Sequence, residues 1–185
     1  MSPTYRFSRR NFLELGIAAA FVGSGCSKAK NKAWRFFTAE EAKTIAALSE
    51  QIIPADQDPG ATWAGVVNYI DRQLCGSLKR FRNNYRQGIA GVEESSRLRY
   101  GKGFGALDTK NQIELMHLLE NGKAPGESWK RTSSSEFFAL LVEHTRQGFY
   151  GDPRHGGNRD AAAWKMLGLP YPPIRGRQRY DLTKG

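Results

Sequence analysis

Residues 133–148 read SSSEFFALLVEHTRQG, and their apolar side chains recur with the period of an α-helix. Ser133 and Glu136 have the spacing of a capping box, in which two side chains bond free amides at a helix start. Gly148 is of a type that commonly ends a helix. We therefore expect a helix with one apolar side, formed by Phe137, Leu140, Leu141 and His144 and broadened by Phe138 and Val142.

Helical spacing also accounts for most of the remaining apolar residues. A capping box at Thr38 and Glu41 starts one helix, which Pro54 ends, and Asp108 or Thr109 caps another, which Gly122 closes. Including these two, four helices are expected besides that of residues 133–148. Their apolar faces are Ala42, Ile45, Leu48 and Ile52; Trp63, Val66, Val67, Ile70 and Leu74; Phe81, Tyr85, Ile89 and Val92; and Ile113, Met116 and Leu119. A short helix is expected over residues 161–167, and no run predicts a strand. The expected fold is an all-α, compact bundle of about five helices with a loop-rich strap that contains Pro170, Pro172 and Pro173.

The chain begins with the pattern of a bacterial export signal. An arginine pair precedes a short apolar run over residues 15–22, which is much shorter than the roughly 20 residues that span a membrane. The segment resembles the twin-arginine consensus at Ser8, Arg9, Arg10, Phe12 and Leu13, while Glu14 departs from it. Residues 1–25 are therefore expected to direct a folded protein through the twin-arginine translocation machinery to the periplasm. A soluble basic arm is the alternative.

The end of this signal resembles a lipoprotein cleavage box. Ser24, Gly25 and Cys26 fit the box, whereas Gly23 stands where a large aliphatic residue is usual. Lipidation of Cys26 would tether the chain to a membrane, since each buried methylene adds about 0.8 kcal/mol of affinity. Ordinary cleavage near Ala29 or Ala33 is the alternative. Residues 26–35 are then expected to form a linker, residues 36–175 one helical domain and residues 176–185 a basic tail.

Composition limits the partners. The 185 residues suffice for one ordinary domain, and the formal charge of +10 falls to +8 without residues 1–25. An exported basic protein meets acidic proteins or membrane surfaces rather than nucleic acid. Lys79, Arg80, Arg82 and Arg86 are expected to form a solvated face, with a docking patch for an acidic partner as the alternative. Cys75 follows an apolar helical pattern and is expected to be a buried small hydrophobe.

The sequence predicts no self-contained active site. We therefore expect no catalytic, cofactor-binding or metal-binding residues in this chain. The glycines of residues 101–106 nominally match a dinucleotide-binding turn, but the preceding residues read as a helix, not as the strand that such a turn needs. His117 and His144 have no ligand neighbours at i+3 or i+4 and are expected at a core edge or surface. The chain has no haem-attachment or iron–sulfur cysteine pattern.

A dense aromatic and glycine-rich loop follows residue 148. It consists of Phe149, Tyr150, Gly151, Asp152, Pro153, Gly156, Gly157 and Asn158, with Trp164 downstream. Asp152 before Pro153 favours a turn, and Asn158 can cap the next helix. A rigid turn that packs on the bundle and a loop that contacts a partner are both compatible with this pattern.

A resemblance to a known family rests on four parts of the chain: this loop, the twin-arginine start, the Ile52-Ile53-Pro54 helix exit and residues 104–112. The chain resembles the gluconate 2-dehydrogenase subunit 3 family. The resemblance covers about residues 36–173, and His155 stands where an aromatic residue is expected. Membership implies a membrane-associated, periplasmic sugar or sugar-acid dehydrogenase complex. Its large subunit carries FAD and the catalytic residues, and a cytochrome c subunit often completes it.

The resemblance implies that this chain is a non-catalytic accessory subunit that helps the large subunit to fold, retain flavin and leave the cell. A signal for folded export on a chain without a detectable cofactor site agrees with an escort role. The alternatives are a lipid-anchored structural protein of the cell envelope with no redox partner, and a small stand-alone flavin oxidoreductase.

Overall fold

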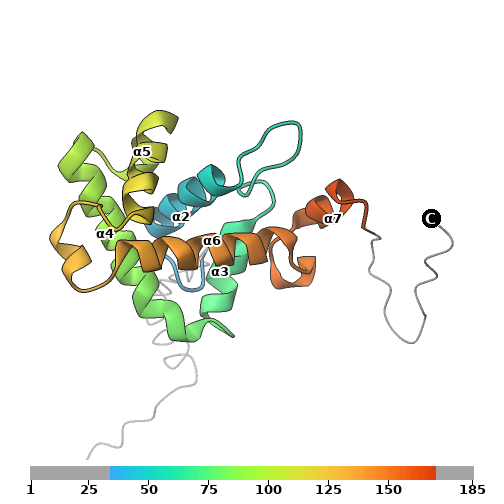
Figure 1. Ribbon diagram of the computed structural model, residues 1–185. Helices are drawn as coiled ribbons and strands as arrows, with labels where there is room; N and C mark the ends of the chain where they lie inside the picture. Colours follow the sequence, from blue (N-terminus) through green and yellow to red (C-terminus); the bar gives the residue numbers. More distant parts are fainter. Residues whose placement is uncertain (1–33, 170–185) are drawn as a thin grey trace, which may run out of the picture. The chain divides into compact units, whose positions relative to one another are not determined.

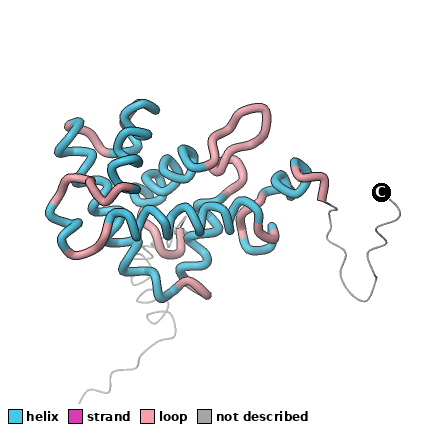
Figure 2. The backbone as a smooth tube through the Cα atoms, in the orientation of Figure 1, coloured by secondary structure: helices cyan, strands magenta, loops and turns pink. Residues whose placement is uncertain are grey.

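The computed structural model describes residues 34–169, and Figure 1 shows that their regular structure is helical. Figure 2 shows only helices and loops in this range, with no strand. The predicted all-α bundle is therefore confirmed. The twin-arginine residues, Cys26, the prolines of the predicted strap and the basic tail lie outside the described residues.

The helices follow one another with short 3₁₀ turns between several of them. Their bounds are α2 Ala39–Ile52, α3 Val66–Leu74, α4 Arg82–Tyr100, α5 Thr109–Glu120, α6 Ser134–Tyr150 and α7 Ala162–Met166. The 3₁₀ turns are η1 Lys79–Phe81, η2 Phe104–Ala106, η3 Glu127–Lys130, η4 Pro153–His155 and η5 Arg159–Ala161. Helix α6 contacts α2, α3, α4, α5 and α7, so the helix predicted from residues 133–148 is the one on which the others pack (Figure 1).

Local sequence signals explain where the helices start. The Thr38 hydroxyl accepts from the Glu41 amide at 3.2 Å, and the Glu41 carboxylate accepts from the Thr38 amide at 2.7 Å. This confirms the predicted capping box, which contributes about 1 kcal/mol. Asp108 caps α5 through the Asn111 amide at 2.8 Å, and Ser133 caps α6 through the Glu136 amide at 3.3 Å.

The core is formed by the apolar faces of α2 to α6, together with residues from the segments between them. Its largest fully buried side chains are Tyr85, Phe37, Phe104, Phe149, Ile45, Leu48, Ile70, Leu74, Leu115, Leu119, Leu141 and His144. Gly88 of α4 lies directly beneath the ring of Phe137, where an added Cβ would come within 2.1 Å of the ring. The absence of a side chain at Gly88 therefore sets how closely α4 and α6 approach.

Gly148 does not end α6, contrary to the prediction. The helix continues to Tyr150, and the Gly151 amide then bonds Gln147 O at 2.9 Å. A Cβ on Gly148 would lie 3.0 Å from the Tyr69 ring, and a Cβ on Gly157 would lie 2.0 Å from Gly148 O. The glycine thus allows two other segments to pack against the helix backbone, a tertiary requirement that its helix propensity does not reveal.

Two residues predicted on apolar helix faces are largely exposed. Trp63 precedes α3, because Gly65 has a φ of +76° and starts the helix at Val66, and 44% of Trp63 is exposed. Ile113 is 43% exposed, because α5 buries the neighbouring face of Gln112, Leu115, Met116 and Leu119.

Candidate functional site

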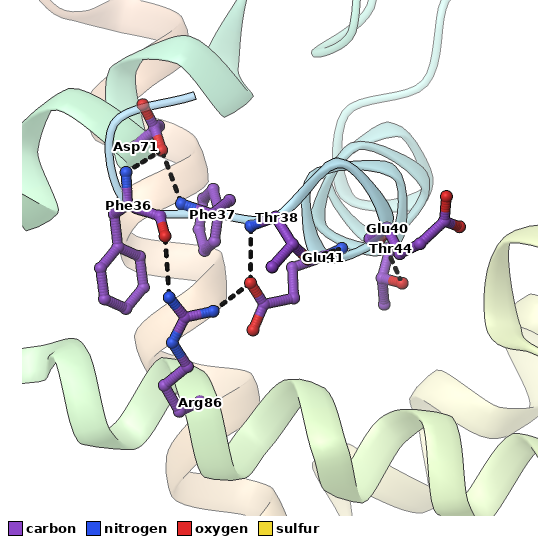
Figure 3. Close-up of polar contacts among 8 residues, drawn as sticks. All are labelled: Phe36, Phe37, Thr38, Glu40, Glu41, Thr44, Asp71 and Arg86. Atoms are coloured by element: carbon purple, nitrogen blue, oxygen red, sulfur yellow. Dashed lines mark hydrogen bonds and ion pairs between the residues drawn. The ribbon is translucent and has the colours of Figure 1, made fainter. Parts of the chain in front are cut away.

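The N-terminal end of the described chain is held by a buried carboxylate. Asp71 of α3 is 3% exposed and accepts hydrogen bonds from three consecutive amides, those of Arg35 at 2.7 Å, Phe36 at 2.8 Å and Phe37 at 2.9 Å. Figure 3 shows the carboxylate facing the backbone of this segment. We call these contacts the Asp71 clamp. The predicted linker is therefore hydrogen-bonded to the helical body from Arg35 onward.

Arg86 of α4 closes the same region from the other side (Figure 3). Its guanidinium donates to Phe36 O at 2.8 Å, lies 4.1 Å from the centre of the Phe36 ring and forms an ion pair with Glu41. Burial raises the pKa of Glu41, but hydrogen bonds from Arg86 and Thr38 outweigh burial and hold it below the ordinary value. Arg82 donates to Leu74 O at 2.6 Å. Two of the four predicted surface cations therefore also hold the fold together.

The loop that carries the family resemblance is held by its own polar groups. Asn158 is fully buried, and both ends of its side-chain amide are bonded. Its Nδ2 donates to Gly151 O at 2.8 Å, and its Oδ1 accepts from the backbone amide of Ala163 at 3.0 Å. The Asn158 side chain thus binds an amide in the first turn of α7, although Ala161 is the residue at the N-cap position of that helix. The Trp164 indole donates to Tyr150 O at 2.7 Å. These contacts close the loop from Gly151 to Asn158 and fasten α7 to the end of α6.

The loop also fastens the start of α3. The Arg159 amide donates to Ala64 O at 3.0 Å, and Gly156 O lies beside Gly65. Asn158, Asp160 and Ala161 all have positive φ, a conformation that costs non-glycine residues free energy. The contacts described above hold these three residues in that conformation and pack the loop against α3, α6 and α7. The structure leaves its contact with a partner untested.

The outward side of this region carries exposed aromatic and aliphatic side chains. Phe149 is buried, whereas Tyr150 is 41% exposed. Trp63 and Met166 line a groove of about 390 Å³ together with Asp58, Pro59, Asp160, Ala162 and Lys165. The Arg159 guanidinium lies 5.6 Å from the centre of the Trp63 ring. Asp152 pairs with Arg154 at 2.7 Å. Sequence reasoning missed Trp63 as a surface residue, because it fits a helical apolar pattern, and did not single out Met166.

His144 lies in the core, not at its edge as predicted. It is 2% exposed, and its Nδ1 lies 3.0 Å from the Tyr85 hydroxyl. The Tyr85 ring stacks on it, and the Phe81 ring packs edge-on at 5.2 Å. Burial lowers the pKa of His144 below its usual range, and burial raises that of Tyr85. The pair is a polar contact between two buried side chains of the core.

The remaining sequence candidates are placed as follows. Cys75 is exposed, which corrects the prediction that it is buried, because α3 ends at Leu74 and the chain turns there. The glycines of residues 101–106 connect α4 to α5, and the segment before them is helical as predicted. His117 is exposed beside Glu120, and His155 is exposed in η4. Within residues 34–169, no group of three side chains suits a metal ion.

Comparison with known protein families identifies the family of this chain. A model of the family described as gluconate 2-dehydrogenase subunit 3 matches residues 39–170. The chain belongs to this family. The match starts at the first residue of α2 and extends beyond α7, so it includes every α-helix of the described body and confirms the resemblance. Membership agrees with an accessory subunit of a dehydrogenase complex. Searches of curated proteins and of solved structures found no match.

None of the helices within residues 34–169 is both long enough and apolar enough to cross a bilayer.

Proposed function

We propose that this chain is a non-catalytic accessory subunit of a periplasmic, FAD-dependent sugar or sugar-acid dehydrogenase. The observation that carries the proposal is the family match over residues 39–170. In the proposed complex, FAD and the catalytic residues belong to a large subunit, and a cytochrome c subunit receives the electrons. This chain assists the folding, flavin retention and export of the large subunit.

The geometry of the family loop agrees with a non-catalytic, structural role for this chain. Its most distinctive residue, Asn158, is fully buried and bonds only to the backbone of this chain in the contacts described above. The loop presents Tyr150 and neighbouring apolar side chains outward from a rigid base. Aromatic side chains on a rigid base are the usual anchors of protein interfaces, because they lose little conformational freedom on binding.

The proposal of export by the twin-arginine route is supported by Arg9 and Arg10. A signal for folded proteins on an accessory chain would explain how a large subunit without a signal of its own reaches the periplasm. Lipidation of Cys26 would then keep the complex at the membrane.

The proposal is tested in the native host with a deletion of this chain, its wild-type complement and an Arg9→Lys, Arg10→Lys complement. Expected are loss of periplasmic flavoprotein and dehydrogenase activity in the deletion, and retention of the flavoprotein in the cytoplasm with the double-lysine chain. Normal export and activity of the flavoprotein without this chain would contradict the proposal. Affinity purification of the wild-type chain should yield a larger, flavin-containing protein.

A further inference from the structure

The positive charge of this protein is unevenly distributed along the chain. Residues 34–169 contain 18 lysines and arginines and 16 aspartates and glutamates, so the described body has a net charge of +2. The whole chain has +10. Most of the excess positive charge therefore belongs to the residues before Trp34 and after Leu169.

Within the body, cations gather where α4 begins. We define the basic face as Lys79, Arg80, Arg82, Arg86, Lys130 and Arg131, all of them exposed. Turn η1 leads directly into α4, and Arg86 lines a groove of about 550 Å³ with Lys130 and Arg131 of the η3 segment. Glu41 and Glu127 pair with this face and reduce its charge to +4. The remainder of the body is therefore net negative.

Aromatic contacts hold three of the guanidinium groups in place. Arg80 lies 4.6 Å from the centre of the Phe81 ring, and Arg82 and Arg86 lie 5.6 Å and 4.1 Å from that of Phe36. A side chain held in this way loses less conformational entropy when it binds an anion than a free one does.

The basic face adjoins the point where the N-terminal segment joins the body. Phe36, which contacts Arg82 and Arg86, lies two residues after Trp34. Cys26 precedes Trp34 by eight residues. Eight residues span at most about 29 Å, so a lipid on Cys26 would keep this region of the body within that distance of a membrane. The basic face therefore lies at the part of the body that a lipid anchor holds closest to the bilayer.

We propose that the basic face docks on anionic lipid headgroups of the bilayer into which the Cys26 lipid inserts. This proposal rests on the proposed export and lipidation. A lipid on Cys26 supplies hydrophobic attachment, and a basic surface beside it adds affinity for anionic headgroups. Each basic side chain near an anionic bilayer strengthens binding about fivefold, and only within about one Debye length. A short tether favours this contact by keeping the basic face near the headgroups, while the face has an affinity of its own that does not need the lipid.

An acidic protein is the competing occupant of the basic face, but the distribution of apolar side chains favours lipid. The exposed side chains Trp63, Tyr150 and Met166 belong to the segment before α3, the end of α6 and α7, not to η1, η3 or the start of α4. Stable protein interfaces have an apolar centre, whereas headgroup contact needs only charge. In the resulting arrangement, the aromatic region is left available for the large subunit.

The test uses the full-length chain with Cys26→Ser, so that no lipid is attached, and flotation with phosphatidylcholine vesicles that contain about one third phosphatidylglycerol. The face variant carries Lys79→Gln, Arg80→Gln, Lys130→Gln and Arg131→Gln, which spares the structural Arg82 and Arg86. The matched control carries Lys102→Gln, Lys110→Gln, Lys123→Gln and Lys165→Gln, four exposed cations elsewhere. Both variants lose four positive charges and keep identical terminal segments.

We expect the face variant to lose at least tenfold in vesicle affinity and the control to lose less than threefold, with circular dichroism unchanged in both. Equal losses in the two variants, or equal binding of the parent chain to vesicles of phosphatidylcholine alone, would overturn the proposal. Co-purification from the native host separates it from the proposed function. A face variant that still retains the flavoprotein supports lipid docking, and one that loses the flavoprotein while binding vesicles normally assigns the face to a protein partner.

Discussion

The carboxylate of Asp71 lies 2.7 Å from the backbone amide of Arg35, although 36 positions separate the two residues in the chain. The bond joins α3 to the segment that leads into α2, and the next two amides share the same acceptor. A buried carboxylate that accepts three amides is well solvated by the protein itself, and charge-assisted bonds of this kind contribute more than neutral ones.

Asp71→Asn should destabilise the protein by about 2–4 kcal/mol, because the amide nitrogen of asparagine has no acceptor capacity for the clamp amides. Chemical denaturation of the purified chain measures the change. Asp58→Asn is the control and should alter the free energy of unfolding by less than about 0.5 kcal/mol, since Asp58 contributes only a backbone amide and carbonyl to the contacts described. Equal effects at the two positions would show that the clamp does not stabilise the fold.

Gly88→Ala should also be destabilising, against its helix propensity. A Cβ at Gly88 would come within 2.1 Å of the buried Phe137 ring, and overpacking of this kind costs about 1–3 kcal/mol. Gly105→Ala is the matched control, because no atom lies within 4 Å of its Cβ position. Thermal unfolding should show a lower Tm for the first and an unchanged Tm for the second, and Phe137→Leu should partly restore the Tm of Gly88→Ala.

Asn158→Asp tests the family loop. The substitution keeps an acceptor for the Ala163 amide but replaces the donor to Gly151 O with a second acceptor, so a loss of about 2–3 kcal/mol is expected. Near-ultraviolet circular dichroism should weaken, because the Trp164 indole is held by a hydrogen bond to Tyr150 O, next to the Gly151 that Asn158 binds. Asn83→Asp, in the first turn of α4, should leave stability unchanged or slightly raised, as an acid is favourable at a helix start. An unchanged spectrum and Tm for Asn158→Asp would contradict the loop's bracing role.

His144 should make stability depend on pH. Burial lowers the pKa of His144 in the folded state below the ordinary value of 6.5, so the unfolded chain binds the proton first as pH falls. The stabilisation is complete above about pH 6.5 and decreases as pH falls through and below that value. The charge of Glu143 raises the pKa of His144 and that of Arg80 lowers it, and Tyr85 bonds the ring. The carboxylates whose pKa values are lowered titrate below this window.

Denaturant midpoints at about pH 7.5 and pH 5.5 measure this dependence. We expect a lower midpoint at the acidic pH for the wild type and a smaller difference for His144→Gln. The control His117→Gln should behave like the wild type, since His117 is exposed. A His144→Gln variant with the full wild-type pH dependence would show that another group causes it.

The bundle could be predicted because each helix carries its own signals. The spacing of apolar residues and the capping residues Thr38, Asp108 and Ser133 act within one or two turns, and the structure confirms them. Asn158, predicted as a cap, does bind the Ala163 amide of α7, but the N-cap position of that helix belongs to Ala161. The same local rules misplaced Trp63, Cys75 and the end of α6, because they do not include what packs against a helix.

The amino-acid sequence by itself determined the helices, the family of the chain and the residues of its characteristic loop, since periodicity, caps and motifs are properties of neighbouring residues. The tertiary structure decided what Asp71, Arg86 and His144 do. Their contacts join positions 34 to 59 residues apart, and such contacts form only when all the helices pack together. It also decided which cations share a face, because the start of α4 and the η3 segment meet only in the folded protein.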